Sequence, residues 1–317
     1  MKVVLDLAQL LESGEINQAE YDKLKRLSVR STGSLAFNIL IGFGVIAVAA
    51  GAIALVPNAL TGIVLGAIII AAGFLILHNG GKEWDVLANI CIILGALGIG
   101  GGVVYMTEGS IWAFLGCAIG FAVAGFIAKS GLLIALSVLS LSSVIGARTG
   151  YSHASYFLAI YEPTMTIIVF SLITLAAYVF SLQLSAVNAR LALMAARVSI
   201  LLVNFGFWIG SLWGDRLSFF TKLSGNVPGG VQIPRIAFVI GWAAALIAFA
   251  VWAMKNDRRW VVNVCAVFGA IHFYTQFFER LGPNPVAILL GGLSALGIAI
   301  AFWQYNKKVV GKPSQPA

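Results

Sequence analysis

Residues 86–106 read VLANICIILGALGIGGGVVYM, an apolar run without a charged side chain. A helix of about 20 residues, rising 1.5 Å per residue, crosses the roughly 30 Å of hydrocarbon in a bilayer. Similar runs recur along the chain, so the sequence predicts an all-α fold, a polytopic transmembrane helical bundle of about ten spans. The other expected spans are residues 35–56, 59–77, 110–128, 132–147, 164–182, 191–213, 235–254, 260–278 and 285–303.

The composition also indicates lipid as the main environment of the chain. Of the 317 residues, 60% are hydrophobic and 10% are charged, and the mean hydropathy is +0.96. Soluble domains carry about 25% charged residues. The net charge of +8 fits Lys and Arg retained on the cytoplasmic side of a membrane, so we expect no nucleic-acid partner. The 3 cysteines lie in apolar runs without metal-ligand spacing, which predicts no metal site.

The Lys and Arg residues indicate an orientation. If the amino terminus is cytoplasmic, alternate loops place most of the 20 Lys and Arg residues inside, with residues 255–259 as the firmest cytoplasmic loop. We therefore expect an N-in/C-in protein with both termini in the cytoplasm. Its expected parts are a cytoplasmic helical hairpin at 1–33, the transmembrane bundle at 34–305 and a basic cytoplasmic tail at 306–317.

The amino-terminal hairpin is the predicted soluble part. Leu7, Leu10 and Leu11 mark one face of a first helix, which Gly14 ends. Asn17 and Glu20 have the spacing of a capping box at the start of a second helix. A unit of about thirty residues cannot bury a large core alone. It is therefore interpreted either as a brace for the bundle or as a docking module for a partner protein.

Residues 11–21, LESGEINQAEY, resemble the opening of a bacterial family of predicted membrane proteins of unknown function (domain of unknown function 2157). The stretch 277–281, the Gly291-Gly292 pair and Lys307-Lys308 are similar to the ending of that family. The resemblance implies a multi-pass protein of the bacterial inner (plasma) membrane. It implies no activity, cofactor or site residue.

Glycine pairs four residues apart are expected to hold the helices together. Lipid gives no hydrophobic drive for helix association, so close backbone approach must supply the dispersion contacts. Such pairs line one face of the third, fourth and seventh expected spans. The packing candidates are Gly98, Gly102, Gly116, Gly120, Gly206 and Gly210.

Polar side chains inside the expected spans are the candidate ligand or ion pathway, because polar groups are costly at membrane depth. The candidates are Arg197, Asn204, His272, Gln276 and Glu279. A His with a carboxylate two turns away suits a proton relay or a cation site. The structural alternatives are Arg197 reaching the headgroups and an interhelical hydrogen-bonded stripe along the ninth span.

The sequence leaves two classes of function. The first is a transporter or permease of a small solute, ion or lipid. The second is a non-enzymatic scaffold or sensor whose amino-terminal hairpin docks a partner. An enzyme is not expected, because only Arg148, His153, Tyr161 and Glu162 gather reactive groups near one interface.

No cofactor is predicted, and the oligomeric state is open. The long loops at 146–163 and 214–234 are expected to lie at the membrane surface.

Overall fold

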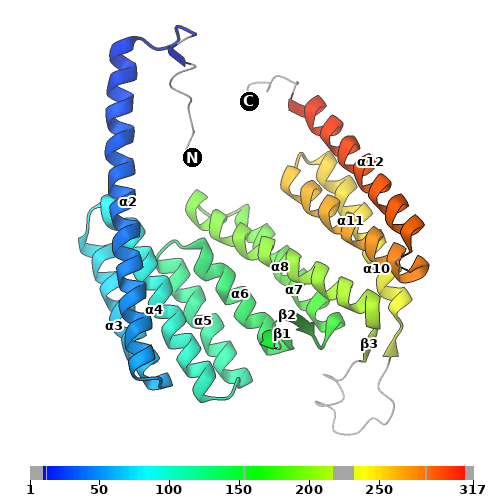
Figure 1. Ribbon diagram of the computed structural model, residues 1–317, viewed down its shortest axis with the longest axis horizontal. Helices are drawn as coiled ribbons and strands as arrows, with labels where there is room; N and C mark the ends of the chain where they lie inside the picture. Colours follow the sequence, from blue (N-terminus) through cyan, green and yellow to red (C-terminus); the bar gives the residue numbers. More distant parts are fainter. Residues whose placement is uncertain (1–9, 12, 153–154, 217–231, 283, 311–317) are drawn as a thin grey trace. The chain divides into compact units, whose positions relative to one another are not determined.

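The structure is a computed structural model that describes residues 10–11, 13–152, 155–216, 232–282 and 284–310. Helices make up most of this part of the chain (Figure 1), so the all-α prediction is confirmed in outline. The helices are α2 (Gln18–Leu55), α3 (Ala59–Asn79), the 3-10 turn η1 (Lys82–Trp84), α4 (Asp85–Met106), α5 (Ile111–Ile127), α6 (Gly131–Ile145), α7 (Pro163–Ser181), α8 (Ala186–Trp213), α10 (Arg235–Lys255), α11 (Arg259–Leu281) and α12 (Pro285–Val310).

Among the described residues, seven helices are long and apolar enough to cross a membrane. They are Phe37–Leu55 within α2, together with α3, α4, α7, α8, α10 and most of α11. The chain is therefore a multi-pass membrane protein. The remaining expected spans coincide with shorter apolar stretches, Ile111–Ile127, Gly131–Ile145 and Ile288–Gly297. At 1.5 Å per residue, α6 reaches only about 22 Å, which is short of the hydrocarbon thickness.

Two short antiparallel hairpins interrupt the helices. Strand β1 (Ala147–Ser152) pairs with β2 (Ser155–Ile160), in a register that runs from Ala147 opposite Ile160 to Ser152 opposite Ser155. Strand β3 (Asp215–Arg216) pairs with β4 (Gln232–Ile233). The sequence analysis expected loops here. The aromatic residues at 151, 156 and 157 favour extended backbone, and pairing satisfies amides that a loop near the membrane would leave open.

Helix α2 runs from the second helix of the predicted amino-terminal hairpin into the first expected span. The predicted capping box is present: the Glu20 amide donates to Asn17 Oδ1 over 2.8 Å, and the Asn17 amide donates to Glu20 Oε2 over 2.9 Å. The helix then runs without interruption to Leu55, so no break marks the expected boundary at residues 33 and 34. In Figure 1 its amino-terminal half extends beyond α3 and α4. The first helix of the expected hairpin lies almost wholly outside the described residues.

The chain divides into two compact units, and α7 and α8 contribute residues to both. Unit 1 comprises Met1–Ile145 and Leu172–Ser199. Its tightest feature is the antiparallel contact of α3 with α4. A Cβ built at Gly66 would lie 2.7 Å from the carbonyl oxygen of Gly95, and one at Gly98 would lie 3.1 Å from that of Gly62. Only glycine permits this approach.

Unit 2 comprises Gly146–Ser171 and Ile200–Ala317. Its apolar core joins α10 to α11 through Trp242, Leu246, Ala253, Val261, Cys265 and Phe268. Trp242 is 1% exposed and Ala253 is fully buried. Phe205, Phe207 and Trp208 of α8 pack against this core from the side. The same three helices also carry polar side chains that bond to one another.

Candidate functional site

A ladder of polar side chains connects α8 with α10 and α11 in unit 2. On the first level, Trp242 Nε1 donates to Asn204 Oδ1 over 2.9 Å, and both side chains are buried. Asn204 Nδ2 also donates to the carbonyl oxygen of Ile200 over 2.8 Å, so both ends of this amide are hydrogen-bonded. In an apolar surrounding, an amide without partners would be costly, and this pairing removes that cost.

Two further levels follow along α8. Trp208 Nε1 donates to Thr275 Oγ1 over 3.0 Å. Gln276 Nε2 lies 3.5 Å from Ser211 Oγ, a long hydrogen bond, and Ser211 Oγ itself donates to the carbonyl oxygen of Trp208 over 2.7 Å. Residues 204, 208 and 211 share one face of α8, because helical neighbours lie three and four positions apart. We call Asn204, Trp208, Ser211, Trp242, His272, Thr275 and Gln276 the polar ladder.

His272 belongs to the polar ladder and has a side-chain nitrogen without a hydrogen-bond partner among the described residues. Its ring lies edge-on to Trp242, with centroids 4.9 Å apart and an interplanar angle of 76°. The side chain is partly buried, and among the described residues its Nδ1 is buried without a hydrogen-bond partner. A ring nitrogen in this position can donate or accept one further hydrogen bond, according to its protonation.

Aromatic rings pack around the polar ladder. Phe268 meets Phe205 edge-on at 5.9 Å between centroids and lies 6.5 Å from Trp242.

The pairs 208–275 and 211–276 advance in the same direction along α8 and α11, so these two helices run parallel. Contacts of Gly210 with Phe238 and of Gly241 with Phe207 advance in opposite directions, so α10 runs antiparallel to α8.

The structure brings together only part of the predicted pathway. Asn204, His272 and Gln276 belong to the polar ladder. Glu279 lies on the same helix as His272, but its side chain is exposed. Arg197 is exposed and belongs to unit 1, whereas the residues of the polar ladder belong to unit 2.

The tryptophans and hydroxyls of the ladder were not among the predicted site residues. Trp208 and Trp242 were counted among the apolar residues, although a buried indole N–H usually finds an acceptor. The signal was present in the sequence: Trp208 lies four residues after Asn204, and Thr275 lies three after His272. What the sequence lacked was the pairing of α10 with α8, which decides the partners.

Most of the predicted packing glycines lie in close helix contacts. Gly98 and Gly102 face α3, and a Cβ at Gly102 would lie 2.9 Å from the carbonyl oxygen of Ala59. Gly206 faces the start of α7 with Ile167 at 3.0 Å from its built Cβ, and Gly210 lies against the ring of Phe238. These glycines permit the close backbone approach that helix association in lipid requires.

Gly116 and Gly120 behave differently. A Cβ built at either position meets no atom within 4 Å among the described residues. Their face of α5 therefore makes no close helix contact there. Spacing alone could not show this, because glycines four apart line up on a helix whether or not a neighbour covers them.

Two buried carboxylates lie at the start of α7 in unit 2. The Thr164 amide donates to Asp215 Oδ2 over 2.8 Å, and Asp215 is 5% exposed. Glu162, which precedes α7, is 7% exposed. A carboxylate at a helix amino terminus accepts amide hydrogen bonds and complements the helix dipole. We therefore assign Asp215 the role of a cap supplied by a distant segment. The sequence analysis considered Glu162 and missed Asp215.

Several expectations lie outside the described residues. They include His153 of the possible interfacial cluster, residues 217–231 of the second long loop, and residues 311–317 of the basic tail. These expectations stay predictions.

Comparisons with known proteins identify no relative of this chain. No family model, no curated protein and no solved structure matches the chain. The resemblance stated on residues 11–21 stays a prediction.

Proposed function

We propose that this chain is a bacterial inner-membrane transporter or permease of a small solute, ion or lipid, with the polar ladder as its pathway. The observation that carries the proposal is His272, whose buried Nδ1 is left for an outside hydrogen-bond partner beside an otherwise bonded ladder. Ionisable side chains at membrane depth are costly, and each is by default a candidate for a pathway of ions or substrate. His is the side chain best suited to take up and release a proton near neutral pH.

The proposed topology has about ten spans with both termini in the cytoplasm, and the distribution of Lys and Arg supports it. In that topology α8 and α11 cross outward and α10 crosses inward. Parallel α8 and α11 with antiparallel α10 agree with this order. The positive residues Lys255 and Arg259 then lie together at the inner end of α10 and α11.

A scaffold or sensor is the second candidate, and a separate observation favours it. Both ends of the Asn204 amide and both ladder indoles are hydrogen-bonded within the protein. The surrounding aromatic core is well packed, as in a structural helix contact. In this interpretation the ladder holds the helices together, and function resides in a partner that binds the amino-terminal segment.

Proton flux across proteoliposomes tests whether the polar ladder conducts protons, which a scaffold would not do. With purified protein, an entrapped pH-sensitive dye and an imposed pH gradient, we expect flux above that of empty liposomes. His272→Ala should lower the protein-dependent flux at least about tenfold, the order expected for loss of a positioned proton-transfer group.

His78→Ala is the matched control for His272→Ala. His78 is exposed in the last turn of α3 and belongs to unit 1, so its removal should leave the flux unchanged. Equal flux in His272→Ala and the unaltered protein would contradict the proposed pathway. Absence of protein-dependent flux would contradict proton transport and favour the scaffold.

Reporter fusions test the proposed orientation. A fusion at Asp257, in the turn between α10 and α11, should be active only with a cytoplasmic reporter. A fusion at Glu108, in the turn between α4 and α5, should be active only with a periplasmic reporter. The opposite pattern would reverse the topology, since Lys and Arg decide which loops stay inside.

A further inference from the structure

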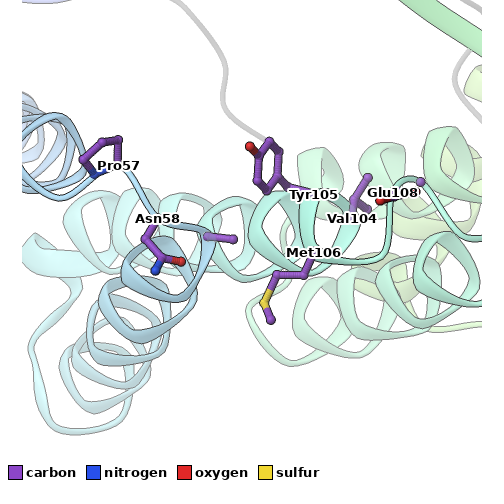
Figure 2. Close-up of a pocket in the computed structure, with 8 residues that line it drawn as sticks. Pro57, Asn58, Val104, Tyr105, Met106 and Glu108 are labelled. Carbon is purple, nitrogen blue, oxygen red and sulfur yellow. The ribbon is translucent and has the colours of Figure 1, made fainter.

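A cavity in unit 1 lies between two turns that the proposed function does not use. It has a volume of about 680 Å³ and is open to the outside. Its lining comes from the turn between α2 and α3 and from the turn between α4 and α5 (Figure 2). The residues are Pro57, Asn58, Ala59, Val104, Tyr105, Met106, Glu108 and Gly109.

One wall of the cavity favours a cation. Glu108 is an exposed carboxylate, held in a tight turn with φ 52° and followed by Gly109 with φ 75°. The carboxyl-terminal turn of α4, Val104 to Met106, also lines the cavity and has no basic residue to offset the helix dipole. The Tyr105 ring adds an electron-rich face of the kind that binds ammonium groups.

The opposite wall favours an anion. It is formed by the start of α3, where Asn58 is the N-cap and its Oδ1 accepts from the Leu60 amide over 3.0 Å. The first amides of a helix point outward and bind anions, phosphate above all. Among the described residues, the amides of Ala59 and Thr61 are not used by this cap.

The rim of the cavity places it at the level of lipid headgroups. Both turns end candidate membrane spans. Large apolar and aromatic side chains around them are exposed, among them Leu55 at 85%, Tyr105 at 78% and Trp112 at 79%. Tyr and Trp gather at the membrane–water boundary, and exposed aliphatic side chains continue along α3 at Leu60, Val64 and Ile68.

We propose that this cavity binds the zwitterionic headgroup of an amine-bearing phospholipid such as phosphatidylethanolamine. The ammonium group contacts Glu108 and the Tyr105 ring, and the phosphate faces the amides at the start of α3. The acyl chains run along the exposed aliphatic side chains of α3. An anionic lipid without an amine lacks the group that Glu108 attracts, so the site distinguishes the two headgroups.

Native mass spectrometry of the full-length protein tests the site. The purified protein is mixed with equal amounts of phosphatidylethanolamine and phosphatidylglycerol that carry identical acyl chains. We expect the amine-bearing lipid to be retained in excess. Glu108→Gln should reduce that preference about fivefold, as for an ion pair near the surface. Asp257→Asn is the matched control, because Asp257 is also an exposed acid in a turn with positive φ, 53°.

Three outcomes would overturn the proposal. One is equal retention of the two lipids by the unaltered protein. Another is an equal loss of preference in Glu108→Gln and Asp257→Asn, which would make Glu108 incidental. The last is that water-soluble phosphoethanolamine at the same concentration binds as well as the lipid, which would assign the cavity to a free solute. The proton-flux assay involves unit 2, so its result does not depend on this site.

Discussion

Replacement of Gly95 by Leu is expected to lower the free energy of unfolding by about 3 kcal/mol, the upper range for inserting bulk into a packed contact. A Cβ at this position would lie 2.5 Å from the carbonyl oxygen of Gly66 and 2.5 Å from the Ile70 amide nitrogen. These are backbone atoms, so no side-chain rotation relieves the clash, and α3 must move away from α4. In lipid, close approach is the main source of helix association, so its loss is not recovered elsewhere.

Gly101→Leu is the control on the same helix. A Cβ at Gly101 meets no atom within 4 Å among the described residues, so the added side chain should be accommodated. Thermal melting of both variants in detergent, followed by size-exclusion chromatography, measures the difference. Similar melting temperatures for the two variants would show that α3 and α4 are not held by glycine contact.

Trp242→Ala is expected to cost about 3–5 kcal/mol, the range for removing a large aromatic side chain from a core. Trp242 is 1% exposed, packs in the apolar core between α10 and α11, and donates a hydrogen bond to Asn204 of α8. Its removal leaves a cavity and also leaves Asn204 Oδ1 without its donor. Chemical unfolding of the purified protein, followed by the fluorescence of the remaining tryptophans, measures the loss.

Two further variants separate the causes. Trp242→Phe keeps most of the packing and removes the hydrogen bond, whose loss should itself cost about 0.6 kcal/mol, the average for such bonds in membrane proteins. Trp112→Ala should cost little in detergent, because Trp112 is 79% exposed. If Trp242→Phe were as damaging as Trp242→Ala, the hydrogen bond rather than the packing would dominate.

Hydropathy and length were sufficient to predict most of the fold. Seven of the ten expected spans coincide with helices that are long and apolar enough to cross a membrane, and the other three coincide with shorter apolar helices. Helices are expected in such segments because a backbone in hydrocarbon must bond its own amides. Asn17 and Glu20 were enough to locate the start of α2, since a capping box acts within one turn. The β1–β2 hairpin was not predicted, because its hydrogen bonds join residues of two different strands. The spacing of residues within either strand alone does not reveal that pairing.

The candidate site was predicted less completely, for a physical reason. Polar residues on one helix can be read from their spacing, and His272 and Gln276 were found this way. Partners such as Trp242 and Asp215 come from elements that are distant in the chain, and helical periodicity carries no information about them. Spacing also failed for Gly116 and Gly120, since a shared face does not reveal its neighbour.

The uninterrupted course of α2 has a mechanical consequence. Residues 18–36 precede the apolar segment Phe37–Leu55 and form about 28 Å of rigid rod at 1.5 Å per residue. A partner bound at the capped end of this segment would therefore be held at a fixed distance from the lipid. Because successive residues are rotated by about 100° around the helix axis, deletion of one residue from this segment would rotate the bound face by about 100° and shorten the segment by about 1.5 Å.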